Sequence, residues 1–229
     1  MATLYLIRHG QASFGKADYD ALSQVGWEQG RVLGRSLRER VFPSGLFAGG
    51  LRRHRETAQA LTEGYADPLP ALQVIEGFNE FDHALMVERL RPEWGDRARM
   101  AADLARTAHP AKAFQQVFAQ ALQRWVCGAF DAEYPETWTA FRARVVNGVE
   151  QAIAQGGGGD VLIATSGGPI AVIVQHLLGL DDARTLEVNE KLANAGVTRV
   201  LYSGERRSLQ VFNSFAHLEA ASPTLVTYR

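Results

Sequence analysis

The clearest indication of the fold of this chain is the stretch Leu4-Tyr5-Leu6-Ile7-Arg8-His9-Gly10-Gln11. Its apolar half is rich in residues of high β-propensity and closes at a glycine, which is typical of a strand buried on both faces. Open α/β folds keep their ligand crevices at the carboxyl ends of such strands. Arg8 and His9 therefore arrive at an edge of a sheet where binding or catalysis is expected.

The residues that follow predict an alternation of helices and strands. We expect a helix from about Ser23 to Arg40, with Ser23 as its N-cap, because apolar residues recur there on one face. The further expected elements are a strand at 46–48, a helix at 51–63, a strand at 161–165, a helix at 170–178 and a hairpin of 197–202 with 208–212. This order favours an α/β fold, a three-layer αβα sandwich with a mainly parallel central sheet.

A segment from about 82 to 141 breaks the alternation and is mostly helical in pattern. Trp94, Trp125 and Trp138 are spaced through it, and they are expected to be core residues. The sequence predicts one domain over residues 1–229 with this segment as a helical insertion. It leaves open whether the insertion caps the crevice or only adds helical packing on one flank.

Charge and composition exclude several classes of function. The formal net charge of -1 offers no overall attraction to nucleic acid or to an anionic membrane. No apolar run reaches the length of a membrane span, and Arg8 comes too early for a signal peptide. A single cysteine, Cys127, permits no internal disulfide, so a cytoplasmic location is expected. Among its apolar neighbours, Cys127 is expected to be a buried thiol.

His9 is the first candidate for chemistry, because imidazole can attack or move protons near neutral pH. Arg8 beside it supplies a fork of donors suited to phosphate or carboxylate, and Gly10 lets the backbone approach a bound group. A second basic cluster, Arg52-Arg53-His54-Arg55, lies at the start of the expected helix 51–63. It is either a solvated basic face or an anion site assisted by the helix N-terminus.

These two clusters carry a resemblance to a known family. The chain resembles the histidine phosphatase superfamily, whose fold is that of phosphoglycerate mutase, and the matching segments keep the family's order. They are Leu6-Ile7-Arg8-His9-Gly10-Gln11, Leu22-Ser23 with Gly26 and Gly34, Leu51-Arg52-Arg53 with Glu56-Thr57-Ala58, Phe78-Asn79-Glu80, Gly168-Pro169-Ile170 and Asn194-Ala195-Gly196-Val197-Thr198.

The resemblance implies a phosphatase that hydrolyses small phosphomonoesters without a cofactor. It implies that His9 takes the phosphoryl group as nucleophile and that Arg8 and Arg53 hold the phosphate oxygens. Glu80 would protonate the leaving group and then activate water, with Glu76 as the rival for that role. Phosphoglycerate-mutase-type transfer is a further alternative, although no recognition signature for phosphoglycerate is evident.

One position departs from the family. Relatives carry a histidine where this chain has Ser166, and a serine cannot supply a positive charge. Three alternatives follow. Ser166 can act with the amides of Gly167 and Gly168, or another histidine such as His217 can approach from the tail. Otherwise the protein is a weakened phospho-ligand binding or regulatory protein.

Further contacts and partners complete the expectation. Gln11 and Ser13 are expected to add polar contacts to the phosphate or its neighbouring group. A nucleotide-phosphate site at Ser166-Gly167-Gly168 is a weaker rival, and no P-loop is present. No histidine spacing indicates a metal site. The expected partner is a small phosphorylated molecule, and the oligomeric state stays open, a homodimer being one alternative.

Overall fold

The computed structural model describes residues 1–13 and 20–228. The chain divides into two compact units, residues 1–80 with 144–229, and residues 81–143. The second unit corresponds closely in its limits to the helical segment expected at 82–141. Its role as a cap stays a prediction, as does the assignment of the whole chain to one domain.

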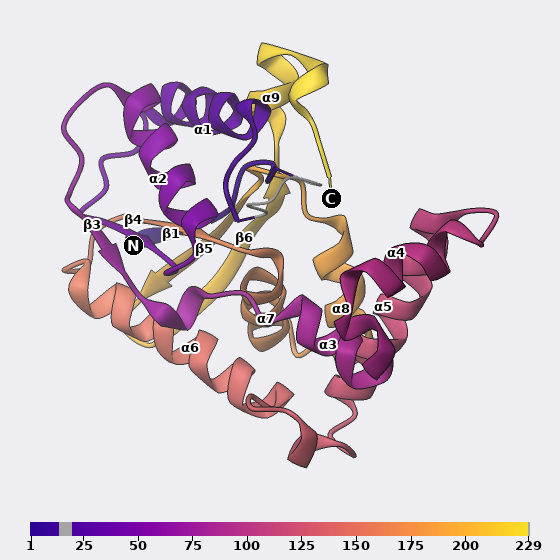
Figure 1. The fold of residues 1–229 in the computed structure, drawn as a ribbon. Helices are drawn as coiled ribbons and strands as arrows, with labels where there is room; N and C mark the ends of the chain where they lie inside the picture. The colour runs from indigo at the N-terminus through magenta and orange to yellow at the C-terminus, as the bar shows by residue number, and fades with distance from the viewer. Residues whose placement is uncertain (14–19, 229) are drawn as a thin grey trace. The chain divides into compact units, whose positions relative to one another are not determined.

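The strands of the first unit form one mixed sheet (Figure 1). They are β1 (Ala2–Arg8), β2 (Gly45–Ala48), β3 (Leu72–Val74), β4 (Val161–Thr165), β5 (Val197–Ser203) and β6 (Arg206–Ser214), in the spatial order β3-β2-β4-β1-β5-β6. The pairs β1 with β4, β2 with β4 and β2 with β3 are parallel, whereas β5 is antiparallel to both β1 and β6. The expected α/β sandwich with a mainly parallel sheet is confirmed.

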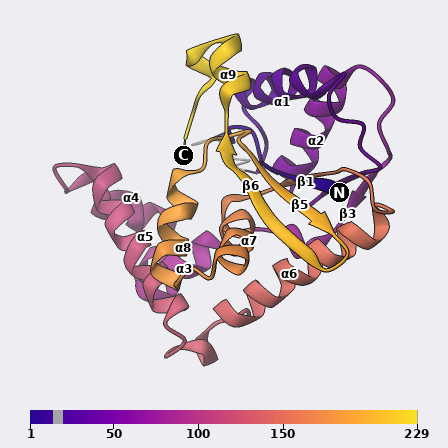
Figure 2. The same cartoon turned by 180° about the vertical axis from the view of Figure 1, so that it is seen from behind.

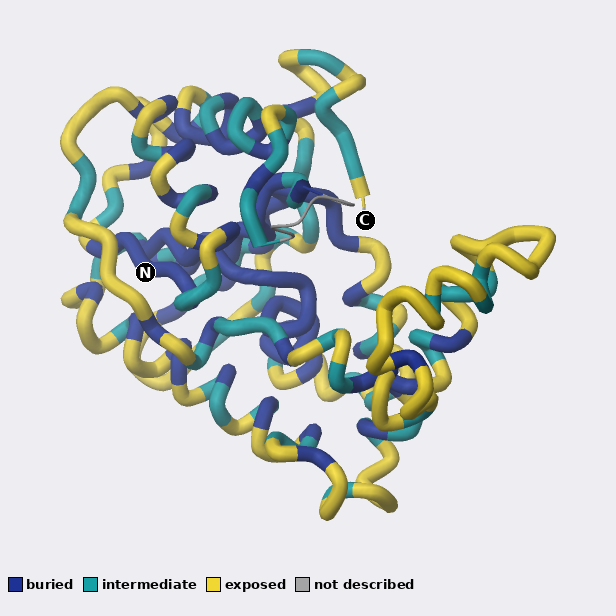
Figure 3. The backbone as a smooth tube through the Cα atoms, in the orientation of Figure 1, coloured by how far each residue is buried: buried dark blue, intermediate teal, exposed yellow. Residues whose placement is uncertain are grey.

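Helices cover both faces of this sheet, as the opposite views of Figures 1 and 2 show. One face carries α1 (Gln24–Leu37), α2 (Arg52–Tyr65) and α9 (Ala216–Ala221), and the other carries α7 (Gly167–Leu178) with the later part of α6 (Trp138–Gln155). Helix α8 (Asp182–Lys191) packs against α7. Because helices lie on both sides, β4 is buried over its whole length (Figure 3).

Helices α1 and α2 pack closely against each other. Ser23 caps α1 as expected, accepting a hydrogen bond from the amide of Gly26. Further along α1, a Cβ at Gly34 would lie 2.1 Å from the carbonyl oxygen of Leu61 on α2. Only glycine permits this approach, so the small residues of α1 let its backbone pack closely against that of α2.

The second unit is built from α3 (His83–Leu90), α4 (Arg97–Ala105) and α5 (Pro110–Val126), with short 3-10 turns at Pro92–Gly95 and Asp131–Glu133. Its tryptophans are buried, as expected. Trp125 packs with the rings of Phe81, Trp138 and Phe141. The expectation for Cys127 is wrong, because this thiol follows the last turn of α5 and is exposed.

Several short elements are not predicted by the sequence. They are β3, α8, α9, the part of α6 beyond residue 141 and the 3-10 turns at Glu76–Phe78 and Pro223–Leu225. Strand β3 has only three residues, all exposed, and is too short for apolar alternation to mark it in the sequence. In the described part of the chain, no helix is long and apolar enough to cross a membrane.

Candidate active site

Strand register brings the predicted site residues to one edge of the sheet. Arg8 of β1 pairs with Thr165 of β4, and Ala48 of β2 pairs with Ala164 of β4. Neighbouring strands lie about 4.8 Å apart, so the residues that follow them, His9, Gly49 and Ser166, begin side by side. The carboxyl ends of three parallel strands therefore converge as the sequence predicts.

His9 is held in one tautomer by its own loop. Its Nδ1 atom lies 2.7 Å from the carbonyl oxygen of Gly10, which can only accept a hydrogen bond. The proton of the neutral ring is therefore on Nδ1, and Nε2 carries the lone pair. A histidine in this state presents a nucleophilic nitrogen.

The surroundings of His9 keep its ring neutral. Burial lowers the pKa of His9 well below its usual value, and the charges of Arg53 and Arg8 and the ring of His54 lower it further. At neutral pH the lone pair of Nε2 is thus available without prior deprotonation.

Arg8 and Arg53 reach the site from different elements. Arg8 is the last residue of β1, is buried, and donates from Nη1 to the carbonyl oxygen of Leu192. Arg53 lies in the first turn of α2, whose N-terminus adds positive potential at the same place. In the first turn of α2, Arg52 is exposed whereas Arg53 is buried, so the basic cluster is only partly a solvated face.

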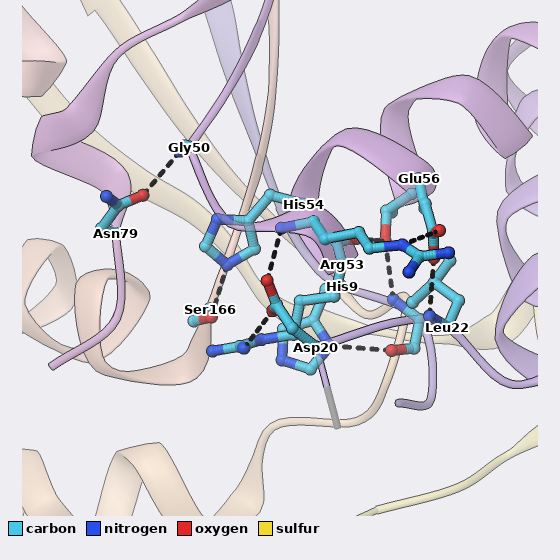
Figure 4. Close-up of polar contacts among 12 residues, drawn as sticks. His9, Asp20, Leu22, Gly50, Arg53, His54, Glu56, Asn79 and Ser166 are labelled. Carbon is cyan, nitrogen blue, oxygen red and sulfur yellow. Dashed lines mark hydrogen bonds and ion pairs between the residues drawn. The ribbon is translucent and has the colours of Figure 1, made fainter. Parts of the chain in front are cut away.

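A carboxylate holds Arg53 in place. Asp20 accepts from Nη1 of Arg53 at 2.6 Å and from the backbone amide of Arg52 at 2.7 Å (Figure 4). Thr57, one turn further along α2, accepts from the amide of Gly10 and donates to the carbonyl oxygen of Arg53. The loop after β1 and the first turn of α2 are thereby tied together around His9.

Ser166 is fully buried and has an unexpected partner. The Nε2 atom of His54 lies 2.6 Å from Ser166 Oγ, and the rings of His54 and His9 have centroids 5.9 Å apart (Figure 4). From the sequence, His54 is expected only to be one member of the basic cluster at 52–55. A signal was available, because positions 54, 57, 58 and 61 share the buried face of α2.

The two candidates for the general acid, Glu80 and Glu76, have different surroundings. Glu80 Oε2 accepts a hydrogen bond from the backbone amide of Gly168, at 3.2 Å, and so lies at the turn that contains Ser166. Glu76 is exposed, bonds to the side chain of Asn79, and lies against Gly50. Glu80 is therefore joined directly to the expected phosphate pocket, whereas Glu76 contacts the loop after β2.

The remaining predicted residues lie around this group. The side chain of Gln11 accepts from Ser23 Oγ, and the hydroxyl of Ser13 donates to the carbonyl oxygen of Leu22. Gly167 is the first residue of α7, directly after Ser166. Phosphate contacts by Gln11, Ser13 and Gly167 stay predictions.

His217 lies elsewhere in the first unit. It lines a cavity of about 700 Å³ together with residues such as Leu37, the last residue of α1, and Arg40, which follows that helix. Burial lowers the pKa of His217 to about 4, so its ring is neutral at pH 7. A neutral ring in that cavity does not supply the positive charge that Ser166 lacks.

Comparison with solved structures identifies the fold. The chain is 21% identical to phosphoglycerate mutase from Bacillus anthracis str. Sterne, with 95% of each chain covered and a TM-score of 0.63. A mutant phosphoserine phosphatase from Entamoeba histolytica, in complex with phosphoserine, is 17% identical, with 95% of this chain and 100% of that chain covered and a TM-score of 0.65. The α-ribazole phosphatase from Shigella flexneri is 19% identical, with coverages of 93% and 96% and a TM-score of 0.61.

The comparison at the level of sequence gives the family. No curated protein sequence matches the chain. The family model of the histidine phosphatase superfamily, branch 1, matches residues 4–214 and so includes both units and the whole candidate site. With this match, and with His9, Arg8 and Arg53 gathered at the carboxyl ends of the parallel strands, the chain belongs to the histidine phosphatase superfamily.

Proposed function

We propose that the protein is a phosphatase that hydrolyses small phosphomonoesters through a phosphohistidine on His9. The observation that carries this proposal is the state of His9, a neutral imidazole whose Nδ1–H is donated to Gly10 and whose Nε2 carries the lone pair that would attack phosphorus. Membership of the superfamily and the presence of phosphatases among the solved neighbours support it.

The first step transfers the phosphoryl group to the enzyme. The Nε2 lone pair of His9 attacks phosphorus, the N–P bond forms and the bond to the leaving oxygen breaks. Glu80, as the carboxylic acid, gives its proton to that oxygen. Arg8 and Arg53 hold the oxygens of the transferring group and balance their charge, which is the main source of catalysis in phosphoryl transfer.

The second step regenerates the enzyme. Glu80, now a carboxylate, takes a proton from water, and the oxygen of that water attacks phosphorus. The N–P bond breaks, inorganic phosphate leaves and the lone pair returns to Nε2 of His9. The proton gained by Glu80 restores its acid form, so both residues are ready for another cycle.

The test uses an aryl phosphate with wild type and the variant His9→Ala. We expect wild type to release phosphate and to show, after rapid quenching, the mass of one added phosphoryl group on the peptide that contains His9. His9→Ala should lose both signals. A panel that includes phosphoserine and a phosphoglycerate then ranks substrates.

The panel also separates the alternative functions. Transfer of phosphate between positions of phosphoglycerate, without net release, would indicate a mutase. Binding of inorganic phosphate with no turnover of any substrate would indicate a phospho-ligand binding protein, the function that the serine at position 166 raises. The exposed Cys127 agrees with a reducing compartment, and we propose a cytoplasmic location on that basis.

A further inference from the structure

The contact between His54 and Ser166 fills the place where relatives carry a histidine. Both side chains are fully buried, and Nε2 of His54 lies 2.6 Å from Ser166 Oγ (Figure 4). The imidazole comes from the first turn of α2, and the hydroxyl comes from the residue that follows β4. The site thus contains an imidazole beside position 166, although that position itself is a serine.

The other nitrogen of His54 indicates which way the hydrogen bond runs. Its Nδ1 atom is buried and has no hydrogen-bond partner within residues 1–13 and 20–228. The backbone is packed against it, because a Cβ at Gly49 would lie 2.3 Å from Nδ1. A buried N–H without a partner is rarer and costlier than a buried lone pair without one. The proton of the neutral ring therefore belongs on Nε2.

The electrostatic surroundings of His54 favour a neutral ring, which carries one proton. Burial lowers the pKa of His54 well below its usual value, and the guanidinium of Arg53 lowers it further. A neutral ring with its proton on Nε2 donates to Ser166 Oγ. Since the oxygen of Ser166 is then occupied as an acceptor, its own proton is free to be donated elsewhere.

The group expected to accept the hydroxyl proton of Ser166 is a phosphoryl oxygen bound at the same edge of the sheet. His9 and Ser166 follow residues that are paired in β1 and β4, and the rings of His9 and His54 are 5.9 Å apart between centroids. A phosphoryl group bound by His9, Arg8 and Arg53 would therefore have an oxygen beside the hydroxyl of Ser166. A hydroxyl that accepts one hydrogen bond becomes a stronger donor of its own proton.

We propose that His54 and Ser166 act as a pair that replaces the single histidine expected at position 166. His54 donates Nε2–H to Ser166, and Ser166 donates its hydroxyl proton to an oxygen of the phosphoryl group. Ser166 is then a phosphate-binding residue, and His54 is a positioning residue that acts through it. The inference rests on the proposed function for its substrate and names how this chain completes the pocket.

The first test is a double-mutant cycle on kcat/KM with an aryl phosphate. Ser166→Ala and His54→Leu should each lower kcat/KM about 10- to 100-fold, because each leaves a buried polar group without its partner. The variant with both changes should be no worse than about threefold below either single variant. His54→Gln, which keeps a donor near the position of Nε2, should retain most of the activity. Ser44→Ala, at the amino end of β2, serves as the control.

The second test moves the imidazole to position 166. Ser166→His alone has no room beside the fully buried His54, so we expect it to lose activity. Combining it with His54→Ala makes space, and this swapped variant should recover to within about tenfold of wild type. Circular dichroism establishes that each variant is folded. A folded swapped variant that stays as inactive as Ser166→His would overturn the proposal.

Binding of orthovanadate or inorganic phosphate, measured by calorimetry, separates this inference from the proposed function. If wild type hydrolyses nothing, the proposed function fails, yet weaker anion binding by both Ser166→Ala and His54→Leu would still support the pair. Losses that multiply in the cycle would show that His54 acts independently of Ser166. Unchanged activity and anion binding in folded His54→Leu would show that His54 has no role.

Discussion

Acid should destabilise the folded protein in part through His217, and the effect can be worked out from its surroundings. Burial in the cavity beside α1 lowers the pKa of His217 to about 4, and the charge of Arg40 acts in the same direction. In the unfolded chain the ring returns to its usual pKa of about 6.5. Between these values the unfolded state binds a proton that the folded state does not.

This difference in proton binding sets the direction and the size of the change in the free energy of unfolding with pH. The free energy of unfolding is unaffected by this group above about pH 6.5 and falls as the pH is lowered toward 4. The difference of about 2.5 pH units, at about 1.4 kcal/mol for each unit, corresponds to about 3–4 kcal/mol, most of which is lost by pH 4. His9 and His54, whose pKa values are also lowered by burial, add losses of the same sign.

Comparison with His217→Gln isolates the contribution of His217. Urea unfolding followed by circular dichroism at several pH values from 7.5 to 4 gives the free energy of each protein. We expect the difference between wild type and His217→Gln to change by about 3 kcal/mol in favour of the variant over this range. His176→Gln removes an exposed imidazole and serves as the control. Equal pH dependence for wild type and His217→Gln would refute the reasoning.

Three further predictions concern packing, charge and proton transfer. Gly34→Ala should lower the free energy of unfolding by about 1–3 kcal/mol, because its Cβ would lie 2.1 Å from a carbonyl oxygen of α2. The control is Gly148→Ala, whose Cβ has ordinary contacts and should not destabilise the protein. Urea titration measures the free energy of unfolding of both variants. Arg53→Gln should move the acid limb of the kcat/KM profile to higher pH, since the charge of Arg53 helps to lower the pKa of His9, the proposed nucleophile. An unmoved limb would contradict this interaction between Arg53 and His9. Glu80→Gln should lower kcat by about 100- to 10,000-fold, and Glu76→Gln should lower it far less. Steady-state kinetics with an aryl phosphate measures both values. A larger loss of kcat in Glu76→Gln than in Glu80→Gln would make Glu76 the general acid.

Local sequence signals were sufficient to predict those strands and helices whose own residues set where they begin or end. The apolar run before Arg8 predicts β1, Ser23 predicts the start of α1, and the run 161–165 predicts β4 with the bounds that the structure has. These signals are strong because burial on both faces demands continuous apolar residues, and because a helix start needs a side-chain acceptor. Short elements such as β3 and α9 lack both signals and were not predicted.

The candidate site likewise has features that follow from local sequence and features that depend on contacts between distant elements. Local patterns were enough to predict that Arg8 and His9 end a buried strand and that basic residues begin the helix at 52–65, because these are properties of single elements. The contact of His54 with Ser166, 112 positions away, and the place of His217 in a separate cavity became visible only in the folded structure. The approach of α1 to α2 and the register of β4 beside β1 set those distances, and both depend on packing between elements that no local pattern encodes.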